Sequence, residues 1–161
     1  MRWKDYENFI ISNLNPSYIN LDTNQILLTI TNTGRLGHAS TTSGNGLIYK
    51  NQNLIFNSGI IASVSPAKIS NCVTNNTSTN FDNDFVAIRP SSYVKSNIAD
   101  QYIYNVITDN NANKVGLKIN QRSYAWKNAP RDKFIIIEYK ITNTNSSKLD
   151  SLNFGIYTDW D

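Results

Sequence analysis

The stretch FIIIEYKIT, residues 134–142, decides the fold class of this chain. Ile135, Ile137, Tyr139 and Ile141 occupy alternate positions, with charged residues between them at positions 138 and 140. Successive side chains of a β-strand point to opposite faces, so this spacing puts the four large side chains on one face. The pattern predicts a strand over residues 134–142, which we expect to be central in its sheet with that face in the core.

Similar short segments recur along the whole chain. Alternation or a short apolar run marks residues 25–31, 46–50, 54–56, 59–64, 85–88, 102–108, 115–126 and 152–157. Residues 51–53 predict a hairpin turn, and Pro90 should end the strand at 85–88, because proline has no amide hydrogen to donate to a neighbouring strand. Residues 34–45 and 74–84 are expected to be irregular. Short strands at this spacing predict an all-β fold, an antiparallel β-sandwich.

Length and composition agree with one β domain. A chain of 161 residues fits a single domain, so we assign residues 1–161 to one β-sandwich domain. The sequence holds 25 Asn but only two Glu, which favours turns over helices. We therefore expect fewer than about a tenth of the residues in helix, against a usual third.

Charge and hydropathy exclude two classes of partner. The net charge is +3 and the basic residues are scattered, whereas nucleic-acid binding needs clustered basic side chains. We expect no nucleic-acid partner. No apolar run approaches the ~20 residues of a membrane-spanning helix, so no membrane insertion is expected either. The first residues do not resemble a signal peptide. If the protein is exported, we expect this chain to be an internal fragment of a longer multidomain protein.

The chain has one histidine and one cysteine, and neither lies in a pattern typical of a catalytic site. His38 is the only histidine, and no serine lies in the Gly-x-Ser-x-Gly turn of a hydrolase nucleophile. We expect His38 to bond to backbone in a loop. Cys72 is the only cysteine, which excludes an internal disulfide. It is expected to be a small buried residue, with an intermolecular disulfide as the alternative.

Two acidic pairs are the candidate metal ligands. Asp82 and Asp84 flank an asparagine in a loop, and Asp159 and Asp161 follow a strand, where alternation would point both carboxylates the same way. Calcium prefers such oxygen ligands, whereas zinc would need several His or Cys. The alternative is turn chemistry for the first pair and simple solvation for the second. No cofactor is expected apart from a calcium ion at these residues.

Aromatic residues are the candidate ligand-binding groups. Tyr102, Tyr104, Tyr124 and Trp126 lie on two predicted strands and could stack on sugar rings if they face solvent. The alternative is that they fill the core or cover a sheet, since aromatic residues favour strands in any case.

The chain resembles a known but uncharacterised family. The resemblance lies in TITNTGRLG (29–37), GNGLIY (44–49), NLIFNSG (53–59), FIIIEYKITNT (134–144) and LNFGIYTDWD (152–161). These stretches are similar to a β-domain of large secreted or surface proteins of Bacteroidetes-type bacteria. Such proteins often combine it with a subtilisin-like protease domain and a type IX secretion sorting domain. The family's domain runs on past the segment that matches DWD, which also indicates a fragment.

The resemblance implies a location and a class of role rather than an activity. It implies a secreted or cell-surface protein in which this domain is a non-catalytic accessory or structural module, with other domains of the same precursor as its partners. None of the protease's catalytic motifs is present, so no peptidase activity is expected, and the acidic residues give no pattern typical of a glycosidase. The alternative function is a carbohydrate-binding module, with a glycan as partner, that uses the exposed aromatics.

Overall fold

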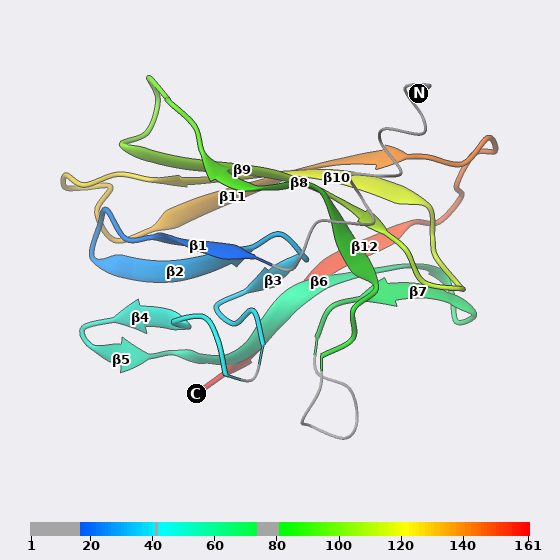
Figure 1. The fold of residues 1–161 in the computed structure, drawn as a ribbon, viewed down its shortest axis with the longest axis horizontal. Helices are drawn as coiled ribbons and strands as arrows, with labels where there is room; N and C mark the ends of the chain where they lie inside the picture. The colour runs from blue at the N-terminus through cyan, green and yellow to red at the C-terminus, as the bar shows by residue number, and fades with distance from the viewer. Residues whose placement is uncertain (1–16, 41, 74–80) are drawn as a thin grey trace.

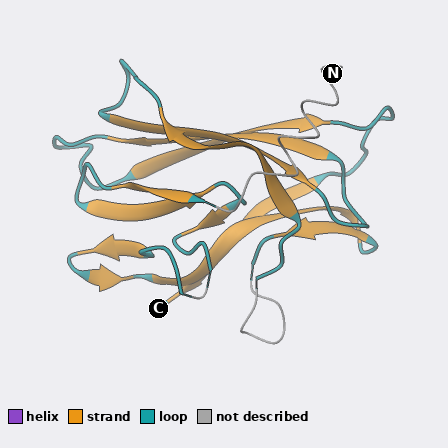
Figure 2. Cartoon of the chain, in the orientation of Figure 1, coloured by secondary structure: helices purple, strands orange, loops and turns teal. Residues whose placement is uncertain are grey.

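The computed structural model describes residues 17–40, 42–73 and 81–161, and these residues form strands and loops without any helix (Figures 1 and 2). The first seven strands are β1 (Tyr18–Leu21), β2 (Ile26–Thr31), β3 (Arg35–Leu36), β4 (Leu47–Tyr49), β5 (Gln52–Asn53), β6 (Ile55–Ser65) and β7 (Lys68–Asn71). The remaining strands are β8 (Phe85–Tyr93), β9 (Gln101–Asp109), β10 (Leu117–Ala125), β11 (Ile135–Asn143) and β12 (Asn153–Trp160).

Two antiparallel sheets face each other, as the sequence predicted (Figure 1). The larger sheet has the order β12-β6-β3-β2-β4-β5, with β1 added to β2 and β7 added to β6. The smaller sheet has the order β11-β10-β9-β8, which is a simple up-and-down meander. The last strand of the chain therefore leaves the smaller sheet and returns to the edge of the larger one.

The core between the sheets is divided into two apolar clusters. One contains Ile60, Phe85, Ile107, Leu117 and Ile119, and the other is built around Leu28, Ile30, Ile55, Ile103 and Ala125. These ten side chains are almost wholly buried. Burial of apolar surface on this scale is the main force that holds two sheets together.

A short polar layer separates the two clusters. Along β10, the buried side chains run Leu117 and Ile119, then Gln121 and Ser123, then Ala125. On β9, Asn105 lies directly opposite Gln121, and both amides are buried. Asn105 Nδ2 donates hydrogen bonds to the Thr31 carbonyl at 2.7 Å and to Ser91 Oγ at 3.0 Å. The side-chain amide of Gln121 has no hydrogen-bond partner in the described part of the chain.

Two predictions about strand position are wrong. The strand at residues 134–142 exists, as β11, and its expected inner face does point into the sandwich, but β11 is an edge strand and not a central one. Ile135, Ile137, Tyr139 and Ile141 are consequently only partly buried. The strand at 85–88 does not end at Pro90 but continues to Tyr93 through two register shifts. Proline is tolerated there because β8 is the opposite edge strand.

Other local predictions fall close to the observed elements. The hairpin turn lies at Lys50 and Asn51, whose φ angles of 50° and 64° suit the two-residue turn between β4 and β5. The segment 59–64 is part of the longer strand β6. The stretch at 34–45 contains the two-residue strand β3, and residues 74–80 of the second irregular stretch lie outside the described residues.

Candidate functional site

Three of the four predicted aromatic residues come together on the outer face of the smaller sheet. Tyr102 on β9 lies directly opposite Tyr124 on β10, and Trp126 follows at the end of β10. They alternate with the buried Ile103, Ser123 and Ala125, so they point away from the core. Phe134, which the sequence analysis did not single out, extends this aromatic row next to Trp126.

The rings of the aromatic row stack on one another. The ring centres of Tyr102 and Tyr124 are 4.9 Å apart with an angle of 12° between the planes, and Tyr124 and Trp126 follow at 6.4 Å and 25°. A sugar ring stacks on the open face of an aromatic ring. Here the faces of neighbouring rings are turned toward each other, and the indole of Trp126 is further fixed by its bond from Nε1 to the Ile98 carbonyl, at 2.6 Å. The row covers the sheet rather than forming a flat platform.

The polar groups beside the row are paired with each other. Arg122 Nη1 donates to Glu138 Oε1 at 2.9 Å, and the hydroxyl of Tyr124 donates to Glu138 Oε2 at 3.3 Å. Partial burial, followed by the charge of Glu138, raises the pKa of Tyr124. The fourth predicted residue, Tyr104, lies under the guanidinium of Arg89 at 4.8 Å and does not stack on the other three.

The first acidic pair has a structural role. Asp82 Oδ2 accepts a hydrogen bond from Asn71 Nδ2 at 2.9 Å, and Asp84 Oδ2 accepts one from the Asn71 backbone N–H at 3.0 Å. These bonds tie the loop before β8 to the end of β7. The bonds join two separate segments and do not lie within a turn, so the turn interpretation and the calcium hypothesis for Asp82 and Asp84 both stay predictions.

The second acidic pair is exposed at the end of β12. The carboxylates of Asp159 and Asp161 have no ion-pair partner among the described residues. Within the same part of the chain, no group of three His, Cys, Asp or Glu side chains lies close enough to hold a metal ion. The calcium hypothesis for these residues stays a prediction.

Arg35 is a buried residue that the sequence analysis missed. Its guanidinium donates to the carbonyl groups of Cys72, at 3.0 Å, and Ala39, at 2.6 Å, and lies 4.3 Å from the ring centre of Phe81. A third bond reaches the Asp82 carbonyl at 3.0 Å. Burial lowers the pKa of Arg35. The side chain joins three loops on the outer face of β3, which is a structural role.

The histidine and the cysteine behave as their simpler interpretations predicted. His38 Nε2 lies 3.4 Å from the Ile55 carbonyl, in a loop. Cys72 is fully buried, and burial raises the pKa of its thiol to about 12. Such a thiol is neither ionised nor accessible at neutral pH, which excludes the intermolecular disulfide in the folded chain.

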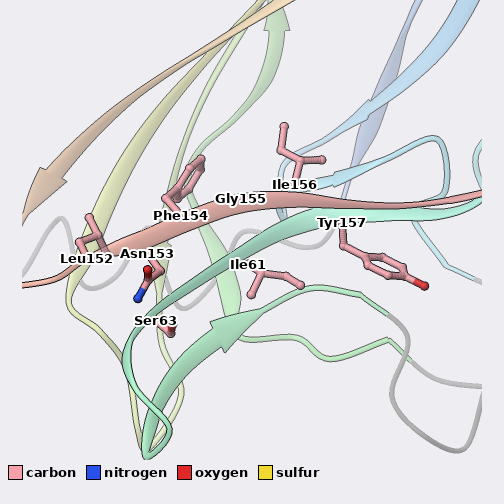
Figure 3. Close-up of a pocket in the computed structure, with 8 residues that line it drawn as sticks. All are labelled: Ile61, Ser63, Leu152, Asn153, Phe154, Gly155, Ile156 and Tyr157. Carbon is pink, nitrogen blue, oxygen red and sulfur yellow. The ribbon is translucent and has the colours of Figure 1, made fainter.

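The sandwich is open on the side where β11 and β12 form the edges of the two sheets. Phe154 of β12 packs against Tyr139 of β11, with ring centres 5.6 Å apart, so this face of β12 points toward the other sheet. Ile156 projects to the same side as Phe154, and Tyr157 projects to the opposite side (Figure 3). Yet Ile156 is 45% exposed and Trp160 is 65% exposed. We call this surface, formed by the edges of β11 and β12, the open side.

Two hollows follow the open side. One, of about 590 Å³, runs along β12 and is lined from both faces of the strand, by Ile61 and Tyr157 on one face and Phe154 and Ile156 on the other (Figure 3). The second, of about 240 Å³, lies between the sheets beside Trp160. Sequence alternation identified the inner face of β11 but could not show that no described strand covers it, because coverage depends on the order of strands in the sheets.

Comparison of the chain with protein-family models, with curated proteins and with solved structures found no match. The family resemblance therefore stays a prediction. Among the described residues, no helix is long and apolar enough to span a membrane.

Proposed function

We propose that this chain is a non-catalytic accessory module of a secreted or cell-surface multidomain protein, and that it binds another domain of the same precursor through the open side. The observation that carries the proposal is the exposure of Ile156 and Trp160 on the face of β12 that points between the sheets. Soluble domains normally cover such a face, and contiguous exposed apolar surface is typical of interaction sites.

The open side also has the composition of an interface. Ile135, Ile137 and Trp160 line the smaller hollow, and Ile156 lines the larger one. Among the described residues that line the two hollows, none is charged. Depletion of charge at the centre and enrichment in large apolar or aromatic residues distinguish the core of an interface from the rest of a surface. The resemblance to a domain of large exported proteins supports the choice of a neighbouring domain as partner.

Hydrogen–deuterium exchange tests this function. Within residues 152–160, the amides that point to the exposed edge of β12 should exchange fast in the isolated chain. Their exchange should be slower by at least tenfold in a longer piece of the precursor that includes the neighbouring domains. The amides of β10, which is covered on both edges, serve as the internal control and should exchange equally in both samples. Equal exchange of residues 152–160 in the two samples would contradict the proposal.

The aromatic row favours a second candidate function, carbohydrate binding. The row is solvent-facing and flanked by the hydrogen-bonding groups of Arg122 and Glu138, although its stacked rings offer edges rather than open faces. Binding to a glycan array that is lost in both Tyr124→Ala and Trp126→Ala would support this function. Phe56→Ala is the matched control, because Phe56 is an exposed aromatic residue on the other sheet. An array without binding removes this candidate.

A further inference from the structure

We propose that the open side binds one added β-strand, which pairs with the free edge of β12 and carries apolar side chains at alternate positions with a Lys or Arg between the first two. This inference rests on the proposed function and names the chemistry of the segment that the neighbouring domain supplies. In strand addition, main-chain hydrogen bonds give affinity and pockets for alternate side chains give specificity.

The first argument is that β12 lacks the features that protect β8 and β11, the two edge strands of the smaller sheet. β8 carries Arg89, Pro90 and two register shifts, and β11 has charged residues at 138 and 140 on its outer face. Such features prevent an edge from pairing with another strand. β12 has no proline or lysine, its only charged residue is Asp159, and its pairing with β6 is regular from Asn153 to Asp159. An edge of this length without protection is suited to pairing.

The second argument is that side-chain space lies beside that edge. The hollow of about 590 Å³ follows β12 from Leu152 to Tyr157 (Figure 3). A Cβ added at Gly155 would meet no atom within 4 Å, so space is open at the middle of the strand. The apolar hollow of about 240 Å³ beyond it is lined by both sheets and ends at Trp160. Its volume suits one or two large apolar side chains.

The third argument is charge. Asp159 and Asp161 are exposed at the end of β12 without an ion-pair partner in the described residues. Residues directly opposite each other on antiparallel strands point to the same face. A residue opposite Asp159 therefore points outward, and those opposite Ile156 and Trp160 point inward. Because the added strand runs antiparallel to β12, its first residue lies opposite Trp160, its second opposite Asp159 and its fifth opposite Ile156. The required order along the added strand is therefore apolar, Lys or Arg, apolar, any residue, apolar.

A direct binding experiment titrates the chain of 161 residues into the heptapeptide TIKVTIT. The peptide is fluorescently labelled, and its two termini are capped so that they carry no charge. We expect saturable binding by fluorescence anisotropy. The peptide TSKSTST should not bind, because it lacks the apolar side chains, and TIKPTIT should not bind, because proline removes a main-chain donor. TIEVTIT should bind more weakly at low salt, and this difference should shrink at high salt.

Variants of the chain locate the site. Ile156→Lys should weaken binding of TIKVTIT at least tenfold, because it places a charge on the inner face of the edge. The matched control is Ile136→Lys, since Ile136 is 47% exposed on the outer face of the other edge strand, and it should bind as the unmodified chain does. Changing Asp159 and Asp161 together to Asn should weaken binding about two- to fivefold, the usual size of exposed ion pairs.

Three results would overturn the inference. They are equal binding of TIKVTIT and TSKSTST, equal loss of binding in Ile156→Lys and Ile136→Lys, and a stable dimer by light scattering that Ile156→Lys dissociates, which would make a second copy the occupant. If the peptide does not bind but residues 152–160 are still protected in the longer precursor, the proposed function stands and only the strand-addition inference fails.

Discussion

Gln121 and Asn105 show how much a single buried amide depends on its partners. They lie opposite each other on β10 and β9. Among the described residues, Asn105 has partners for its Nδ2 but not for its Oδ1, and neither polar atom of the Gln121 side chain has one. A buried polar group without a partner costs about 1–3 kcal/mol. Gln121→Met, which keeps the volume and removes both polar atoms, should therefore raise the free energy of unfolding by about 1–3 kcal/mol.

Asn105→Leu is the matched control for that change. It removes the hydrogen bonds to Thr31 and Ser91, and it should lower the free energy of unfolding. Chemical denaturation measures the free energy of unfolding of both variants, and the slopes of its dependence on denaturant concentration should be equal. A stabilised Asn105→Leu, or a destabilised Gln121→Met, would show that the two amides do not differ as their contacts indicate.

Asp109 is a second residue whose role depends on its position. Its buried carboxylate accepts hydrogen bonds from the N–H groups of Gly116, at 2.9 Å, and Leu117, at 2.7 Å, and from Ser70 Oγ at 2.9 Å. Asp109→Ala leaves these buried donors unpaired and should cost about 2–4 kcal/mol. Asp150→Ala removes only a surface ion pair with Lys148 and should change stability by less than about 0.5 kcal/mol. Chemical denaturation measures the loss in free energy of unfolding for both variants, and equal losses would contradict the structural role of the Asp109 carboxylate.

At the scale of elements, strand position decides what an apolar residue contributes. Ile119 on the central strand β10 is fully buried, and Ile137 on the edge strand β11 is partly buried. Ile119→Ala should cost about 2–5 kcal/mol, through lost burial and a cavity. Ile137→Ala should cost about 1–2 kcal/mol, because part of its side chain is already in water. Equilibrium unfolding of both variants tests this order, and an Ile137→Ala cost equal to that of Ile119→Ala would mean that the open side is covered in solution.

The same pair of strands shows what the sequence could predict. Alternation depends only on the local chain, so it identified the inner face of β11 correctly. Whether a strand is central or at an edge depends on which distant segments pair with it, and no local pattern contains that information. The neighbours of β12 were unpredictable for the same reason. The sequence left open whether Tyr102 and Tyr124 face solvent or the core, and their outward position and mutual stacking depend on the packing and register of β9 and β10.

At the scale of the whole molecule, the two outer faces of the fold are better covered than the open side. The outer face of β3 is covered by loops that Arg35 joins, and the outer face of the smaller sheet is covered by the aromatic row. The open side has no such cover among the described residues. The apolar open side is suited to receive a partner, which agrees with the proposed accessory role.

The remaining whole-molecule prediction concerns calcium and the two acidic pairs. An ion that binds only the folded chain must raise the melting temperature by mass action. If calcium binds, the carboxylates of Asp159 and Asp161 are the ligands we expect, because those of Asp82 and Asp84 already accept hydrogen bonds from Asn71.

The rise in melting temperature with excess calcium should then disappear with chelator and in the variant with both Asp159 and Asp161 changed to Asn. Asn is nearly the same size, and both residues are exposed, so this variant should melt as the unmodified chain does without calcium. A rise that survives in the double variant would assign calcium to other residues, and identical melts with calcium and chelator would exclude a stabilising site at Asp159 and Asp161.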